Sequence, residues 1–202
     1  LTYTNEFHSG FSFQVTTRLR KDESSHLIPF IRQDKDKSFV KSISTSELEL
    51  KLRYAPNEKF FQTQWNRFPV SLDAPVFTLT HTMAAKGVLG GDYTYHYTEA
   101  GFQKRFWFSA FGYTDVILKA GKVWDKVPFP LLIMPNANLS YTIQPESYSL
   151  MNAMEFMNDE YFSWDVTYFL NGWLFNRIPL LKKLKWRLSL IHISEPTRLA
   201  LI

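Results

Sequence analysis

Acidic side chains gather in one stretch of the sequence, and they are its first candidates for chemistry. Glu155, Asp159, Glu160 and Asp165 form this carboxylate cluster. Paired carboxylates suit acid–base work or cation binding. In a strand-rich protein, carboxylates more often pair with basic neighbours, so structural pairing is the preferred interpretation. We predict one polar network made of Lys104, Arg105, Glu155, Asp159 and Asp165.

Other residue types with chemical potential show no productive spacing. The histidines His8, His26, His81 and His96 are dispersed, and the chain has no cysteine, so neither a metal-ligand pattern nor a thiolate site is present in the sequence. No serine lies in a nucleophile-elbow pattern, and the glycines of KGVLGGD lack the lysine of a phosphate loop. We therefore predict a protein that is not an enzyme and has no catalytic residue, cofactor or metal.

The elements that would position these side chains are long amphipathic strands. In residues 148–187, Trp164, Val166, Tyr168 and Leu170 fall on one parity, and polar residues fall on the other. This alternation predicts strands with one apolar and one polar face. We predict two such strands joined by a tight turn at Asn158, which is typical of a hairpin in an outer-membrane β-barrel.

Residues 42–54 carry the cleanest alternation in the chain. Glu47, Glu49, Lys51 and Arg53 alternate with leucines and a tyrosine. The segment ELELKLR also contains good helix formers, but a helix would spread its leucines around the circumference. A strand with a lipid-facing apolar side explains the pattern better. The predicted lipid-facing residues are Leu48, Leu50, Leu52, Trp164, Val166, Tyr168 and Leu170.

The remaining chain predicts further strands separated by loops. Proline and charge place loops at residues 21–38 and 55–75, and the proline-rich residues 127–135 are expected to fold as a plug or against a rim. Further strands are predicted at residues 1–6, 10–20, 76–83, 92–111 and 114–123. The predicted fold class is therefore all-β: an antiparallel meander of about eight strands, longer than those of most soluble sheets.

Composition agrees with a membrane barrel without requiring one. Aromatic residues make up 17% of the 202 residues, and they would serve either a soluble core or the aromatic girdles of a barrel. No apolar run approaches the roughly 20 residues of a membrane helix. The net charge is only +4, and the basic cluster Lys182, Lys183, Lys185 and Arg187 is interpreted as a solvated connection, so no nucleic-acid partner is predicted.

Several motifs resemble those of a known family. They include the segments GKVW (121–124), VPFPLL (127–132), LMN (150–152), NG (171–172) and NRIPLL (176–181), with RYAP (53–56) as a looser match. The chain resembles the C-terminal barrel region of domain-of-unknown-function family 5686 from Bacteroidota, over about residues 42–187. Full-length members often begin with a carboxypeptidase-regulatory-like β-sandwich. The resemblance implies an outer-membrane barrel and carries over no catalytic set.

The two ends of the sequence lead to a further expectation. Residues 188–198, LSLIHISEPTR, match the translation of a sequencing adapter, so residues 188–202 are predicted to be a non-native tail. His192, Ser194 and Glu195 then carry no catalytic meaning. Residues 1–187 are predicted to be a partial barrel, incomplete at both ends, because no signal peptide precedes the first strand and the resembled family continues beyond Arg187.

Two principal hypotheses follow for function. The first is a non-enzymatic outer-membrane β-barrel that contacts lipid and acts in envelope transport or assembly, with unknown envelope partners. The second is a soluble β-barrel or β-sandwich that binds carbohydrate or lipid. A barrel-housed enzyme that uses Glu155 is a weaker third. The first two differ in which face is outside: a membrane barrel exposes the Leu48 and Trp164 rows, whereas a soluble barrel buries them.

Overall fold

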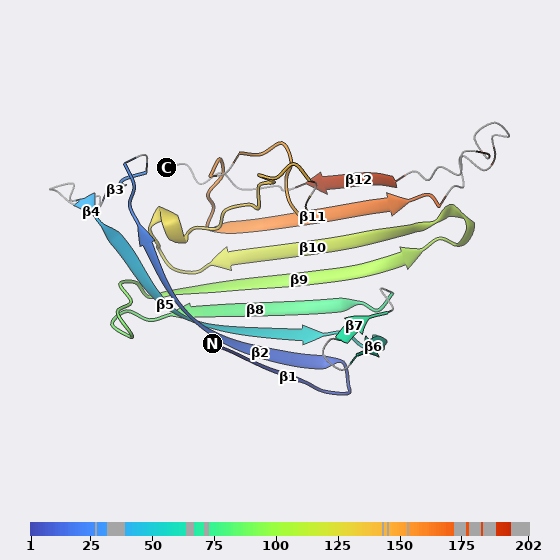
Figure 1. Ribbon diagram of the computed structural model, residues 1–202, viewed down its shortest axis with the longest axis horizontal. Helices are drawn as coiled ribbons and strands as arrows, with labels where there is room; N and C mark the ends of the chain where they lie inside the picture. Colours follow the sequence, from blue (N-terminus) through green and yellow to red (C-terminus); the bar gives the residue numbers. More distant parts are fainter. Residues whose placement is uncertain are drawn as a thin grey trace.

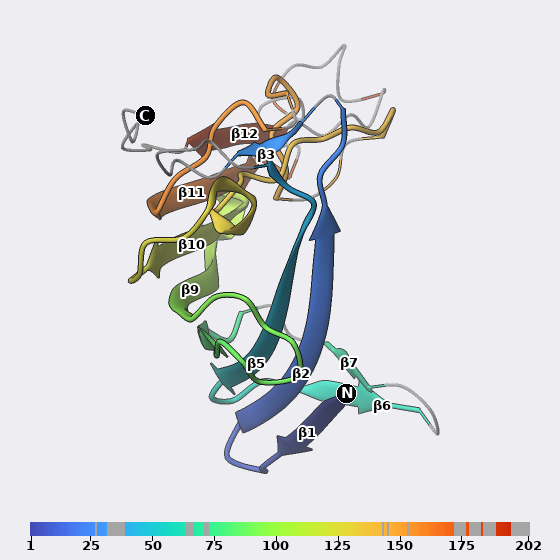
Figure 2. The same ribbon diagram turned by 90° about the vertical axis from the view of Figure 1, so that its left-hand side faces the viewer.

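The computed structural model describes residues 1–202 except 27, 32–38, 64–66, 71–72, 143, 145, 153, 172–176, 178–182, 184–188 and 195–202. The described chain is an antiparallel, eight-stranded sheet with two small two-stranded additions, and Figure 1 shows its long strands side by side. The sheet is curved: Figure 2 shows β2 and β5 turned away from the plane of β9 to β11. The described residues contain no helix of the length and apolarity that a membrane crossing requires.

Strand order follows the chain almost throughout the main sheet. The order is β1-β2-β5-β8-β9-β10-β11-β12, with β3 paired to β4 and β6 paired to β7 outside it. The main strands are β1 (Thr2–Glu6), β2 (Phe11–Glu23), β5 (Ser42–Tyr54), β8 (Val76–Ala84), β9 (Tyr95–Trp107), β10 (Tyr113–Val123), β11 (Glu160–Phe169) and β12 (Ser189–Ser194). The small strands are β3 (Phe30–Ile31), β4 (Phe39–Val40), β6 (Phe60–Gln62) and β7 (Arg67–Pro69), and the 3-10 turns are η1 (Ser109–Phe111) and η2 (Phe129–Leu131).

Most predicted strands are confirmed, because their alternation is long and uninterrupted. β5 begins and ends where the alternating segment does, and it pairs along its whole length with β2. The first hairpin forms as predicted, with β1 paired to β2. Gly112 closes the β9–β10 turn with a φ of 103°, a conformation that favours glycine. The all-β antiparallel meander is thus confirmed. Within the described residues the sheet is open, because its edge strands β1 and β12 do not pair with each other.

The predicted hairpin in residues 148–187 is wrong in its first half. The segment before β11 is irregular, and only an isolated bridge joins Asn158 to Ile133. Met154 has a φ of 63°, which an extended strand does not allow. Residues 148–157 lack the apolar–polar alternation that marks β11. β11 instead pairs with β10, which lies before the irregular segment in the chain.

The predicted non-native tail contributes β12, which pairs with β11. This pairing does not test the origin of the tail, because an alternating apolar segment of any source can join an open strand edge. Residue 188 and residues 195–202 of the tail lie outside the described residues, as do Lys182, Lys185 and Arg187 of the basic cluster and most of the NRIPLL motif.

Candidate functional site: the polar face of the sheet

The strand register sorts the main sheet into two chemically different faces. Lys51 lies between Gln14 and Thr80, whereas its neighbour Leu50 lies between Val15 and His81. The polar face carries Gln14, Thr16, Arg18, Glu47, Glu49, Lys51, Arg53, Thr78, Thr80, Thr82, Tyr97, Glu99, Gln103, Arg105, Asp115, Lys119, Ser163, Asp165 and Thr167. The apolar face carries Phe11, Phe13, Val15, Leu19, Leu48, Leu50, Leu52, Tyr54, Phe77, Leu79, Met83, Phe102, Phe106, Val116, Leu118, Phe162, Trp164, Val166 and Tyr168.

Toward one end of the strands, burial runs opposite to hydrophobicity across these two faces, although farther along β5 Lys51 is exposed and Leu50 and Leu52 are half-buried. On β5, Glu47 is only 7% exposed, whereas the adjacent Leu48 is 41% exposed. On β8, Leu79 is 44% exposed and Thr82 of the polar face is buried. A water-soluble sheet hides its apolar face, because burial of apolar surface is the main favourable term in folding. At this end of the strands, the polar face is therefore the more enclosed of the two faces.

Glu47 is the centre of one polar cluster on this face. Its carboxylate accepts a hydrogen bond from the Tyr95 hydroxyl at 2.8 Å and one from the Thr45 hydroxyl at 2.9 Å. The guanidinium of Arg18 lies 3.7 Å from the same carboxylate and 3.8 Å from that of Glu49. A buried carboxylate needs such donors, since an unpaired one would carry a large desolvation cost. The cluster links β2, β5 and β9.

Glu99 holds a second cluster between β9 and β11. Its carboxylate accepts hydrogen bonds from the hydroxyls of Tyr97 at 2.6 Å and Tyr161 at 2.7 Å. The Tyr161 ring crosses β10 at Gly121, where a Cβ atom would overlap it. Gly121 therefore makes room for a tyrosine that reaches across a whole strand.

Arg105 and Asp115 form a third cluster near the opposite end of the strands. Two guanidinium nitrogens of Arg105 donate to the two oxygens of Asp115 at 2.6 and 2.7 Å, which is the bidentate geometry that arginine favours. The same guanidinium lies 4.1 Å from the centre of the Tyr113 ring. The fork fixes β9 against β10 on the polar face.

Residues 127–148, which we call the covering segment, lie over part of the polar face. Leu131 of η2 packs with Ala84 and Tyr95, and Phe129 makes an edge contact with Phe30 of β3 at 5.4 Å. An ion pair joins Glu146 of the covering segment to Lys119 of β10. A cavity of about 220 Å³ remains between the segment and the strands, lined by charged groups that include Glu99, Lys119 and Asp165. Residues 127–135, which were expected to fold as a plug or against a rim, thus contribute Leu131 to the packing on the polar face of the sheet.

The predicted polar network is dispersed rather than assembled. Arg105 and Asp165 lie on the polar face, but Arg105 pairs with Asp115, and Asp165 accepts a hydrogen bond from Thr167 at 3.3 Å. Glu155 is exposed and accepts from the backbone amide of Asn152, within its own loop. Asp159 is also exposed, just before β11.

Lys104 corrects the predicted network most directly. It lies on the apolar face, where its ammonium group sits 5.0 Å from the centre of the Phe106 ring. Consecutive strand residues point to opposite faces, so Lys104 and Arg105 never share a network within one strand. The prediction treated sequence adjacency as spatial adjacency, and the strand period contradicts it.

Six of the seven residues predicted to face lipid lie on one face of the sheet. Leu48, Leu50 and Leu52 of β5 share the apolar face with Trp164, Val166 and Tyr168 of β11. Leu170 is the exception: it follows the last residue of β11 and is only 9% exposed, so it does not belong to the exposed apolar surface. Odd or even position in the sequence no longer indicates which face a side chain takes once the strand has ended.

The arrangement on the polar face is that of a structural network. The carboxylates of Glu47, Glu99 and Asp115 already accept hydrogen bonds from protein donors, which leaves none of these three poised as an acid or base toward a substrate. Within the described ranges, no three histidine or carboxylate groups gather as a metal site. Sequence reasoning missed Glu99 and Asp115 as network members, although each lies on the polar parity of its strand.

Comparison with known proteins places the chain in a family and gives no nearer relative. No curated protein and no solved structure matches it. A family model matches residues 9–192, which is most of the chain and agrees with the motifs between residues 53 and 181. The chain belongs to the family described as the C-terminal domain of a family of unknown function, DUF5686.

Proposed function

We propose that this domain is part of a transmembrane β-barrel in a bacterial outer membrane, non-enzymatic, and acting in envelope transport or assembly. The observation that carries the proposal is the reversed burial of the two faces: Glu47 is enclosed while Leu48 and Leu79 are exposed. Lipid is the solvent that suits an exposed apolar face, and a barrel lumen suits an enclosed polar one.

The dimensions of the apolar face support this placement. Its apolar positions run from Phe11 to Leu19 on β2 and from Phe162 to Tyr168 on β11. At about 3.3 Å per residue, these stretches measure roughly 20–26 Å along the strand. Strands of outer-membrane barrels tilt by about 35–45°, so these stretches would cover roughly 14–21 Å of an apolar band that is about 25 Å tall. β2, β5 and β9 have 13 residues each, more than the approximately 9 to 11 that a tilted membrane strand needs.

Side chains at the two ends of the apolar face also suit a membrane boundary. Phe108, Phe111 and Tyr168 gather at one end, and the Tyr168 hydroxyl donates to the backbone carbonyl of Phe111 at 2.7 Å. At the other end lie Lys122 and the exposed Trp124. Aromatic rings with a polar atom favour the level of the lipid head groups. In this placement, the covering segment narrows the lumen.

Single-cysteine labelling tests the proposal directly, because the natural chain has no cysteine. Cysteines would be placed one at a time at Glu47, Leu48, Glu49, Leu50 and Lys51, and each would carry a spin label in phospholipid vesicles. Oxygen concentrates in lipid, so it should shorten the relaxation times of spin labels at Leu48 and Leu50. A water-soluble nickel complex should shorten the relaxation times of labels at the three charged positions. A soluble ligand-binding sheet would give the opposite alternation, or protein that stays out of the vesicles.

A further inference from the structure

Two small residues break the otherwise bulky surface of the apolar face. Ala100 of β9 and Ala120 of β10 are directly opposite each other in the register. Their outer neighbours in the same row are Leu79 of β8 and Phe162 of β11, which are 44% and 41% exposed. The large side chains of Leu79 and Phe162 thus flank the two small alanine side chains, which form the floor of a depression. The two alanines and Phe162 line a groove of about 390 Å³ that is open to the outside of the sheet, and Leu79 borders the depression that adjoins it.

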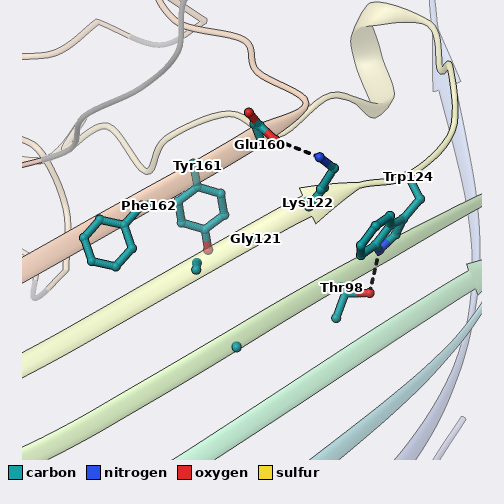
Figure 3. Close-up of a pocket in the computed structure, with 9 residues that line it drawn as sticks. Thr98, Gly121, Lys122, Trp124, Glu160, Tyr161 and Phe162 are labelled. Carbon is teal, nitrogen blue, oxygen red and sulfur yellow. Dashed lines mark hydrogen bonds and ion pairs between the residues drawn. The ribbon is translucent and has the colours of Figure 1, made fainter.

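One end of this groove is polar and carries both signs of charge. The Lys122 ammonium lies 2.9 Å from the Glu160 carboxylate, and both groups point outward on the apolar face (Figure 3). The Trp124 indole N–H donates to the Thr98 hydroxyl at 2.9 Å, and Lys122 lies 5.5 Å from the centre of the indole ring. Trp124 is nevertheless 62% exposed, so a broad aromatic surface borders the ion pair.

Below the polar end, the groove continues into apolar surface. A second depression shares Ala100, Ala120 and Phe162 with it and extends toward Phe77, Phe102 and Leu118. A molecule that filled both depressions would need an apolar chain along the strands and a polar head at the level of Lys122. That combination is the chemistry of a membrane lipid.

We propose that this groove binds a phosphatidylethanolamine molecule, with an acyl chain on the alanine floor and a head group that opens the Lys122–Glu160 ion pair and pairs with both side chains. The inference rests on the membrane placement proposed above. Charge complementarity selects the head group: the Lys122 ammonium donates to the lipid phosphate, and the lipid ammonium donates to the Glu160 carboxylate. Phosphatidylglycerol brings no cation for Glu160. Phosphatidylcholine brings a cation whose nitrogen carries no hydrogen to donate.

Quenching of Trp124 fluorescence by brominated lipids tests the site. The chain and its Trp124→Phe variant would be placed in phosphatidylcholine vesicles that contain a minor fraction of brominated phosphatidylethanolamine, phosphatidylglycerol or phosphatidylcholine. The difference between the two proteins isolates the signal of Trp124. Brominated phosphatidylethanolamine should quench this signal with an apparent affinity about two- to fivefold above the other two, the scale of one partly exposed charged pair.

Matched variants identify the contacts responsible for the preference. Glu160→Gln should remove the preference for phosphatidylethanolamine over phosphatidylcholine, and Ala120→Leu should weaken quenching by filling the floor. Val116→Leu adds bulk on the same strand and face but outside the groove, so it should change neither the lipid preference nor the strength of quenching. Equal quenching of Trp124 by all three lipids would overturn the site while leaving the membrane placement intact. Absence of quenching by any of them would overturn both proposals.

Discussion

Replacing Leu79 by arginine gives the sharpest test of which solvent contacts the apolar face. Leu79 lies in the middle of β8, is 44% exposed, and has Leu52 and Ala100 as its neighbours in the register. If water surrounded this face, an arginine there would change stability by no more than about 0.5 kcal/mol, as at most exposed sites. If lipid surrounds it, a charge near the bilayer midplane costs about 2–4 kcal/mol.

The two magnitudes are far enough apart for a simple assay. A cost of 2–4 kcal/mol reduces the equilibrium constant between inserted and released protein roughly 30- to 1,000-fold, since about 1.4 kcal/mol is a factor of ten. The inserted fraction would be measured as the protein that resists carbonate extraction from phospholipid vesicles. Thr80→Arg is the matched control, because Thr80 is the next residue on the same strand and faces the interior between Lys51 and Glu99. This variant should insert almost as well as the unmodified chain.

The outcome that refutes the reasoning is equally specific. Equal insertion of Leu79→Arg and Thr80→Arg would show that no lipid contacts the apolar face at β8. A Leu79→Arg protein that is folded and monomeric in buffer without lipid would favour the soluble ligand-binding alternative. The comparison depends only on a difference between two adjacent positions, so pairing of strand edges between copies of the chain would affect both variants alike.

Two other predictions concern the stability of the sheet. Gly112→Ala should lower the free energy of unfolding by about 1–3 kcal/mol in urea titrations in detergent. The residue has a φ of 103°, and a Cβ atom there would overlap the Phe169 carbonyl. Gly87→Ala is the control: Gly87 has open space around it, so this variant should cost about 1 kcal/mol. Asp115→Ala should cost about 1–3 kcal/mol in the same titration, since it leaves the Arg105 guanidinium without its fork partner.

The strands were predictable where one local rule decided them. In β5 the alternation of charge and leucine sets strand type, bounds and face at once, so the structure agrees with the sequence in all three. The same rule assigned Trp164, Val166 and Tyr168 to one face of β11. Periodicity is a property of consecutive residues, so it needs no knowledge of the distant parts of the chain.

The polar network was not predictable in the same way, because it depends on cross-strand register. Glu99 meets Tyr161 only because β10 places Gly121 between them. Register follows from turn lengths and from pairing across long loops, which the sequence states only weakly. The alternation around Arg105 did carry one usable signal: Asp115 lies on the polar parity of the next strand, across the short turn at Gly112.

The polar face is itself divided, and the division explains where the covering segment binds. Toward one end of the strands this face carries Ile43, Ala84, Tyr95 and Val123, all of them buried. Leu131 of the covering segment packs there, with Val127 beside it, so the apolar side chains of the segment meet the few apolar side chains of an otherwise hydrophilic surface. Toward the other end the face carries the Arg105–Asp115 fork, which water or a polar solute can contact. The covering segment therefore narrows one end of the interior face and leaves the other end accessible. The ion pair between Lys119 and Glu146 holds the covering segment to β10 on the covered side of this division.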